Sequence, residues 1–326
     1  MLSLFRRNLF VNYLWLLLFT AACLGYYGLK PNALTVLDFS LPLSEQHGFV
    51  IPLADTVFFQ LIYAFVLIYI QALLVARIVI KNRMSRVLSI VPAAIFVLFC
   101  MILLHSGVVH TVLLANLFLL LSLQSLLALY KKYKPIGTIF NAGFFLGIAC
   151  LLYMPNIIFL LGLIMGLMSL RGLKLKELLQ MVVAFICPIF LFGVLMQYSG
   201  DLPSMMAHYK LSLHLPDLNT KDMELLGKLV LLLGICVFML VKNSNLLKKK
   251  KFDVIKKIEL NFWFLLLGFI SVFFAEQITS YHMIILSVPF SVLVGLFMES
   301  RDNAITKEFV FILFVAYYFS LVFDVI

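Results

Sequence analysis

The sequence predicts an all-α, polytopic integral membrane protein, and three observations support this fold class. Hydrophobic residues make up 64% of the chain and charged residues only 12%, whereas soluble domains average about 25% charged residues. The apolar residues gather into runs of roughly 20 residues, which is the length that a helix needs to cross a hydrocarbon core of about 30 Å. Basic residues fall mainly in the short loops between these runs. We therefore expect a single transmembrane domain over residues 1–326.

Eleven apolar runs qualify as transmembrane helices. The first run follows two arginines, contains bulky aromatic residues and lacks a small-residue cleavage site, so we expect a retained span and not a signal peptide. The runs cover approximately residues 9 to 28, 57 to 80, 87 to 104, 111 to 130, 136 to 153, 156 to 170, 178 to 198, 225 to 242, 260 to 276, 282 to 298 and 309 to 326.

Charge divides the connections between these runs into two groups. One group holds 21 of the 25 Lys and Arg residues and six of the 15 carboxylates, a net charge of +15. The other group holds all six His residues, nine carboxylates and four Lys, a net charge of −5. Because basic loops stay in the cytoplasm, this difference predicts a cytoplasmic N-terminus and an external C-terminus. The basic residues thus orient the chain, and we expect no nucleic-acid partner.

Two neighbouring runs, 136 to 153 and 156 to 170, are separated by only a few residues around Pro155. A single kinked helix is one alternative, but it would place the basic loops before and after it on opposite sides of the membrane. The charge rule therefore favours a tight helical hairpin. Small residues four apart, at Gly143 and Gly147 and again at Gly162 and Gly166, predict close helix packing within this hairpin or against its neighbours.

Three connections are longer than the others. The loops at about 29–56 and 199–224 lie on the outer side, and their mixture of proline and apolar residues predicts structured segments that frame an external cavity. The connection at about 242–259 is predicted to be a basic cytoplasmic loop.

The first outer loop carries the leading candidate catalytic residues, Asp38, Glu45, His47 and Asp55. A carboxylate at a membrane surface can act as a general base or bind a divalent metal that bridges a lipid phosphate. The alternative is that these are ordinary solvated residues of an outer loop. Apart from a divalent metal, the chain indicates no cofactor.

The second outer loop carries candidate substrate-binding residues, His208, Lys210 and His214. Histidines six residues apart do not share a helix face, so this spacing favours a phosphate or sugar contact over a zinc site. Lys228, in the eighth run, either contacts a phosphate or pairs with Glu224 one helical turn earlier.

Glu276, Tyr281 and His282 form a third polar cluster, at the outer ends of the ninth and tenth runs. Other polar residues inside the runs are mainly amides, and no run carries a central carboxylate, which argues against a proton-coupled transporter. These amides are Gln60, Gln71, Asn116, Gln124, Asn141 and Gln180. The cysteines lie in apolar runs without a CxxC motif, so we expect buried free thiols at Cys23, Cys100, Cys150, Cys187 and Cys236.

An ordered set of motifs lies between Asn116 and Phe190: Ala142-Gly143-Phe144, Tyr153-Met154-Pro155, Arg171 and Pro188. In this order the chain resembles an uncharacterised family of polytopic inner-membrane proteins of Bacteroidota, which implies a bacterial inner-membrane location. The same block more distantly resembles the GT-C superfamily of membrane glycosyltransferases, which take a sugar from a polyprenyl-phosphate donor. The GT-C resemblance implies that Asp38 is the base and that Lys228 or Lys210 meets the donor phosphate.

Three functions remain open at this point. The first is a GT-C-like enzyme that acts on a polyprenyl-phosphate-linked sugar at the periplasmic face. The second is a non-catalytic membrane subunit or scaffold of a cell-envelope complex, which would have other membrane proteins as partners. The third is a transporter. Membrane lipid is an expected partner in all three cases.

Overall fold

The computed structural model describes residues 5, 10–29, 57–85, 89–104, 111–172, 174–200, 234, 250–274, 280–299, 308, 310–312 and 314–316. These residues form helices and the turns that join them, and the described part of the chain contains no strand. The principal α-helices are α1 (Phe10–Leu29), α3 (Val57–Lys81), α4 (Val91–Leu104), α5 (Thr111–Leu127), α6 (Ile136–Leu152), α7 (Phe159–Arg171), α8 (Leu175–Ser199), α11 (Phe252–Ser271) and α12 (Ser287–Met298).

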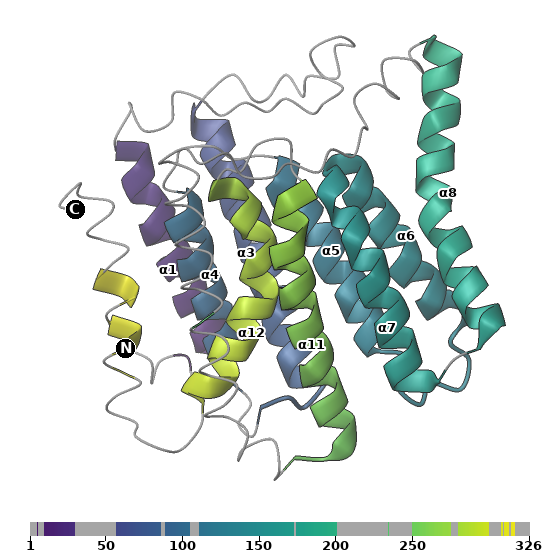
Figure 1. Cartoon of the computed structure of the whole chain (residues 1–326). Coiled ribbons are helices and arrows are strands. Elements are labelled where there is room, and N and C mark those ends of the chain that lie inside the picture. The colour runs from purple at the N-terminus through teal and green to yellow at the C-terminus, as the bar shows by residue number, and fades with distance from the viewer. Residues whose placement is uncertain are drawn as a thin grey trace.

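The helices form a bundle in which they run up and down between two ends (Figure 1). Helix α4 packs against α3 and α12, while α6 packs against α5 and α8. The two groups meet where α3 packs against α5, and α11 packs against both α7 and α12. Helix α8 lies at the edge of the bundle and extends upward beyond its neighbours (Figure 1). By length and composition, four described helical segments could cross a membrane: Leu61–Lys81, Met154–Arg171, Leu175–Ser199 and Phe252–Phe274.

The predicted hairpin after α6 is confirmed. Tyr153 is extended, with φ −154° and ψ 102°, and ends α6, and the 3-10 helix η3 (Met154–Ile158) then leads into α7. Arg171, at the far end of α7, donates Nη1 hydrogen bonds of 2.7 Å to the carbonyl of Lys132 and 3.3 Å to that of Leu129, just before α6. The two basic loops therefore lie at the same end of the bundle, which a single kinked helix would not allow.

Glycines provide the close helix contacts that their spacing predicts. A Cβ atom added at Gly147 would lie 2.4 Å from the carbonyl oxygen of Phe185 and 2.4 Å from Cγ of Pro188, both on α8. At Gly143 it would lie 2.4 Å from the carbonyl oxygen of Met181. Because backbone atoms occupy this space, no side chain fits there, and α6 and α8 meet backbone to backbone.

The second glycine pair faces two different helices. A Cβ at Gly162 would lie 2.8 Å from Leu267 of α11, and one at Gly166 would lie 2.5 Å from Leu126 of α5. Glycine therefore lets α7 fit between α5 and α11.

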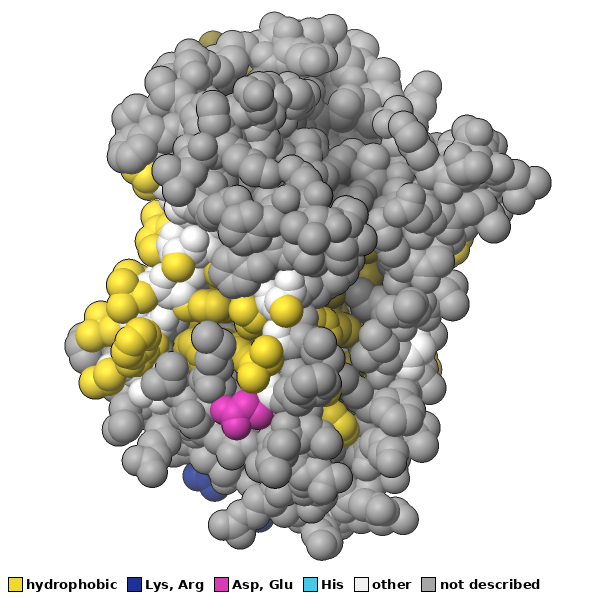
Figure 2. Space-filling view, turned by 90° about the vertical axis from the view of Figure 1, so that its left-hand side faces the viewer, with side chains coloured by type: hydrophobic (Ala, Val, Ile, Leu, Met, Phe, Trp, Pro, Cys, Tyr) yellow, Lys and Arg dark blue, Asp and Glu magenta, His cyan; other side chains and the backbone are white. Residues whose placement is uncertain are grey.

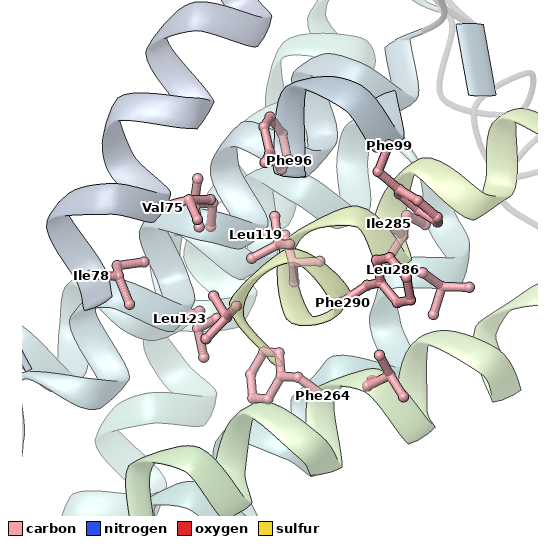
Figure 3. Packing of buried hydrophobic residues seen from close by; sticks show 14 of the residues in the cluster. Val75, Ile78, Phe96, Phe99, Leu119, Leu123, Phe264, Ile285, Leu286 and Phe290 are labelled. Atoms are coloured by element: carbon pink, nitrogen blue, oxygen red, sulfur yellow. The ribbon is translucent and has the colours of Figure 1, made fainter. Parts of the chain in front are cut away.

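Aromatic and aliphatic side chains fill the centre of the bundle (Figure 3). Phe99 of α4 stacks on Phe290 of α12 with ring centroids 4.5 Å apart, and Phe159 of α7 packs on Phe264 of α11 at 5.4 Å. Figure 3 shows Leu119 and Leu123 of α5 among the same group of side chains. The contacts thus come from helices that are far apart in the sequence.

Apolar side chains also cover the outside of the bundle. Figure 2 shows the face at the left of Figure 1, where the described side chains are mainly hydrophobic across the middle. On α1 the exposed apolar side chains include Val11, Trp15 and Leu18. The C-terminal half of α8 likewise exposes Phe190 and Leu195. A soluble protein rarely exposes so large an apolar surface. The described bundle is that of a helical membrane protein.

The described charges gather at one end of the bundle, which we call the basic end. Its connections are joined by hydrogen bonds: Lys250 donates to the carbonyl of Met84, and Lys256 donates to that of Ser169 at 2.6 Å. Every Lys and Arg in the described ranges lies in these connections or in the adjoining helical turns. The charge segregation read from the sequence is therefore present in space at this end.

The start of α11 corrects one prediction. The helix begins at Phe252, so the predicted loop of about 242–259 is wrong from that residue onward. Val254 and Ile258, four residues apart, are both buried, and Lys256 between them lies along the helix surface. The predicted loop was too long because lysines in the first turns of an amphipathic helix look like loop residues when they are counted as charges alone.

Candidate functional site

Most of the predicted site residues lie outside the described residues. This applies to Asp38, Glu45, His47 and Asp55 of the first outer loop, to His208, Lys210 and His214 of the second, and to Lys228 and Glu276. The described part places the backbone of Tyr281 and the whole of His282 in the 3-10 helix η5 (Ser280–Leu286), which leads into α12. The candidate site that can be built from described residues therefore begins at His282.

His282 is only 4% exposed and shares a hydrogen bond between its Nδ1 atom and the hydroxyl group of Tyr153. The ring centroids are 5.4 Å apart, at an interplanar angle of 31°. Tyr153 sits at the turn of the α6–α7 hairpin, so this contact joins the hairpin to η5 at the end of the bundle opposite the basic end. An imidazole and a phenol in contact can exchange the roles of proton donor and acceptor.

Sequence reasoning identified His282 but missed Tyr153 as its partner. In the sequence Tyr153 stands only within the hairpin motif, and 129 residues separate it from His282. No local spacing signals a contact over that distance, and the pairing follows from how η5 packs beside the hairpin.

A second polar group lies deep inside the bundle, where side chains of α3, α5 and α12 meet. Asn116 donates its Nδ2 atom to Oε1 of Gln71 at 2.9 Å and to the hydroxyl oxygen of Ser287 at 3.3 Å. Gln71 in turn donates to the carbonyl of Leu113 at 2.8 Å. All three side-chain members of this group, Gln71, Asn116 and Ser287, are fully buried. Polar residues inside a membrane bundle usually hold helices together in this way.

Two further asparagines make similar contacts between elements. Asn261 of α11 donates to the carbonyl of Pro289 of α12 at 3.0 Å, and Asn156 of η3 donates to that of Ala149 of α6 at 3.1 Å. The Oδ1 atoms of Asn116, Asn156 and Asn261 are buried and have no hydrogen-bond partner among the described residues. Each of these oxygens can accept a hydrogen bond from a buried water molecule.

The described residues contain no group of three or more His, Cys, Asp or Glu side chains that could hold a metal ion. The acids predicted to bind a divalent metal lie outside the described ranges. Cys23, Cys100 and Cys150 are buried free thiols, as predicted, whereas Cys187 is a free thiol that is only half-buried. Cys236 lies outside the described residues.

Glu299, a partly buried carboxylate of the basic end, lies immediately after α12. Ser89 donates a hydrogen bond to its Oε1 atom, while Oε2 is buried without a partner among the described residues. Burial raises the pKa of Glu299 to about 7, against the opposing effects of hydrogen bonds from Ser85 and Ser89 and of the positive charge of Lys250. The carboxyl group therefore titrates near neutral pH and links α12 to the α3–α4 connection.

The fold and these polar contacts define the chain as a helical membrane protein. No family model, no curated protein and no solved structure matches it.

Proposed function

We propose that this chain is a non-catalytic integral membrane subunit, a scaffold that holds its two long outer loops for a cell-envelope complex. In this proposal the chain crosses the bacterial inner membrane eleven times, with its N-terminus in the cytoplasm and the basic end on the cytoplasmic side. The observation that supports this proposal is the packing of the bundle interior, where close glycine contacts and buried amides hold neighbouring helices together.

The contacts that support a scaffold are of two kinds. At Gly143 and Gly147 the backbones of α6 and α8 leave no space for a side chain. In the interior, the polar groups of Gln71, Asn116 and Asn261 make bonds to neighbouring helices. Both kinds of contact fix helix positions, and a rigid platform needs no other chemistry.

Complementation of a deletion strain tests this proposal. Variants that change the outer acids without changing the fold, Asp38→Asn, Glu45→Gln and Asp55→Asn, should restore the parent phenotype. A variant that disturbs the platform, Gly147→Leu, should not restore it. Loss of function in any of the three acid variants, at normal protein abundance, would contradict a non-catalytic role.

A second candidate function is a GT-C-like transfer of sugar from a polyprenyl-phosphate donor at the periplasmic face. The observation that favours it is the Tyr153–His282 pair, because ionisable residues inside a membrane bundle commonly mark functional sites. In this candidate function Asp38 acts as the base and Lys228 or Lys210 contacts the donor phosphate.

The enzyme candidate makes a different prediction for Asp38. Removing a general base typically lowers the rate by about 10² to 10⁴ while the fold stays intact. Asp38→Asn should then abolish complementation at unchanged protein abundance, and Lys228→Gln should weaken it. Full complementation by Asp38→Asn would leave the scaffold as the remaining proposal.

A further inference from the structure

The basic end carries a surface that neither proposed function uses. Three segments meet there: the α5–α6 connection, the α7–α8 connection and the first turns of α11, at the lower ends of these helices in Figure 1. Residues 128–136, 171–177 and 250–257 together contain ten Lys and Arg residues and only two carboxylates. We propose that this surface binds the headgroup of an anionic phospholipid.

Hydrogen bonds hold the first two segments side by side. The Nη1 atom of Arg171 donates to the carbonyl of Lys132 at 2.7 Å, and Gln180 of α8 donates to the carbonyl of Ile136 at 2.8 Å. Lys134 and Lys176 lie within about one helical turn of these bonds. The lysines of the two loops therefore face one region of the membrane surface.

The third segment joins the same region through Tyr130. Lys131 and Lys257 both lie over its ring, with their Nζ atoms 5.5 Å and 5.6 Å from the centroid. One aromatic ring thus contacts two ammonium groups, one from the α5–α6 connection and one from α11. We call Lys131, Lys134, Lys174, Lys176 and Lys257 the lysine patch.

Two carboxylates, Glu177 and Asp253, lie beside the five lysines of the patch, and Asp253 interacts electrostatically with Lys257. Glu177 is engaged with Arg171 at 2.9 Å, while Lys174 lies 3.9 Å away from it and is 61% exposed. Lys134 and Lys176 are exposed and make no polar contact with another described residue. Several like charges held close together favour a ligand that carries negative charge.

Exposed apolar residues beside the lysines identify the kind of anion. Tyr133 is 93% exposed, and Ile136, Leu175 and Phe252 are each 67% or 68% exposed. Exposing such side chains to water is unfavourable, whereas they are stable at the membrane interface, between the lipid headgroups and the acyl chains. A ligand with a phosphate group and acyl chains satisfies both features, since its phosphate can meet the ammonium groups while its chains lie on the apolar residues. Basic pockets between helices bind lipid headgroups in this way.

The test uses the purified full chain in detergent and titrates dioleoyl phosphatidylglycerol, with thermal unfolding as the readout. Each lysine near a membrane surface contributes about 1 kcal/mol, so two substitutions should weaken half-maximal stabilisation roughly 30-fold. We expect this shift in Lys134→Gln/Lys176→Gln. The matched control is Lys81→Gln/Arg83→Gln, which removes two charges from exposed residues of the basic end outside the patch and should behave like the parent.

Native mass spectrometry of the same samples counts the lipids that remain bound. The parent and the control should retain phosphatidylglycerol, and the patch variant should lose it. Equal weakening in the control and the patch variant would mean general attraction to charge and would overturn the site. Equal stabilisation by phosphatidylcholine would also overturn the proposed lipid site. Displacement of the lipid by inorganic phosphate at about 10 mM would overturn it as well.

Discussion

At the scale of single residues, the bundle uses buried amides as hydrogen-bonding groups between helices. Asn116 contacts Gln71 and Ser287, and Asn261 contacts the backbone of Pro289. In the sequence, an amide among leucines and phenylalanines is only an isolated polar residue, and nothing local identifies its hydrogen-bond partner. Its partner decides whether it stabilises the bundle, because an unpaired amide in an apolar interior is costly.

Asn116→Leu should destabilise the folded protein. The substitution removes two hydrogen bonds and leaves Oε1 of Gln71 buried without its donor, which should cost about 1 to 3 kcal/mol. Thermal unfolding in detergent measures this change. Asn141→Leu is the control, since Asn141 is an exposed amide on α6, and it should unfold like the parent. Equal stability of the two variants would show that the amide group contributes nothing.

Glu299 should make the stability of the bundle depend on pH. Its pKa is raised to about 7 in the folded protein from an ordinary value of 4.5, so folding favours the protonated form. The stabilisation is complete below about pH 4.5 and is lost as the pH rises through about 7, with a total change of at most about 3 kcal/mol.

The loss of this stabilisation should lower the unfolding temperature of the parent between about pH 5 and pH 8. Glu299→Gln should remove that fall. Glu259→Gln, at an exposed carboxylate of α11, should keep it. A parent protein whose unfolding temperature does not change over this range would exclude the effect.

At the scale of elements, α6 and α8 depend on each other most directly. Gly143 and Gly147 face the backbone of α8 at Met181 and Phe185, so the interface tolerates no added side chain. The glycine spacing in the sequence predicted a close contact, but it did not show which helix would be the neighbour. Helix α8 follows the hairpin and returns beside its first member, which the hydrogen bond from Gln180 to Ile136 also fixes.

Gly147→Leu should separate α6 from α8. Its Cβ alone would lie 2.4 Å from two groups of α8, and overpacking of this kind typically costs about 1 to 3 kcal/mol or more. Folded yield and size-exclusion profiles in detergent should both deteriorate. Gly137→Leu is the control on the same helix, because a Cβ there would meet nothing within 4 Å. If both variants fold like the parent, this interface is not close-packed.

At the scale of the whole molecule, the proposed orientation rests on charge. The described basic residues gather at one end, and the predicted external residues are separated from them along the chain by complete apolar runs. Single cysteines placed beside His47 and His208 should react with an impermeant reagent in intact cells, whereas a cysteine beside Lys249 should react only after permeabilisation. These experiments require a parent chain without its five native cysteines. Labelling beside Lys249 from outside would reverse the proposed orientation.

Much of the fold could be predicted because the positions of helices in a membrane protein depend on the local hydropathy of the chain. The apolar runs at 9 to 28 and 57 to 80 agree closely with α1 (Phe10–Leu29) and α3 (Val57–Lys81). Most of the runs at 225 to 242 and 309 to 326 lies outside the described residues, and the count of eleven spans stays a prediction. Among the site residues predicted from the sequence, His282 alone has a described side chain.

The sequence by itself determined the membrane class, the helical hairpin at Pro155 and the gathering of basic residues at one end. These properties depend on the hydropathy and charge of neighbouring residues, which the linear chain contains in full. Only the tertiary structure decided that Tyr153 meets His282, that Asn116 meets Gln71, and that Lys131 and Lys257 share the ring of Tyr130. The physical reason is that packing brings together residues from helices distant in the chain, and uniformly apolar helices carry little local information about which of their faces will meet.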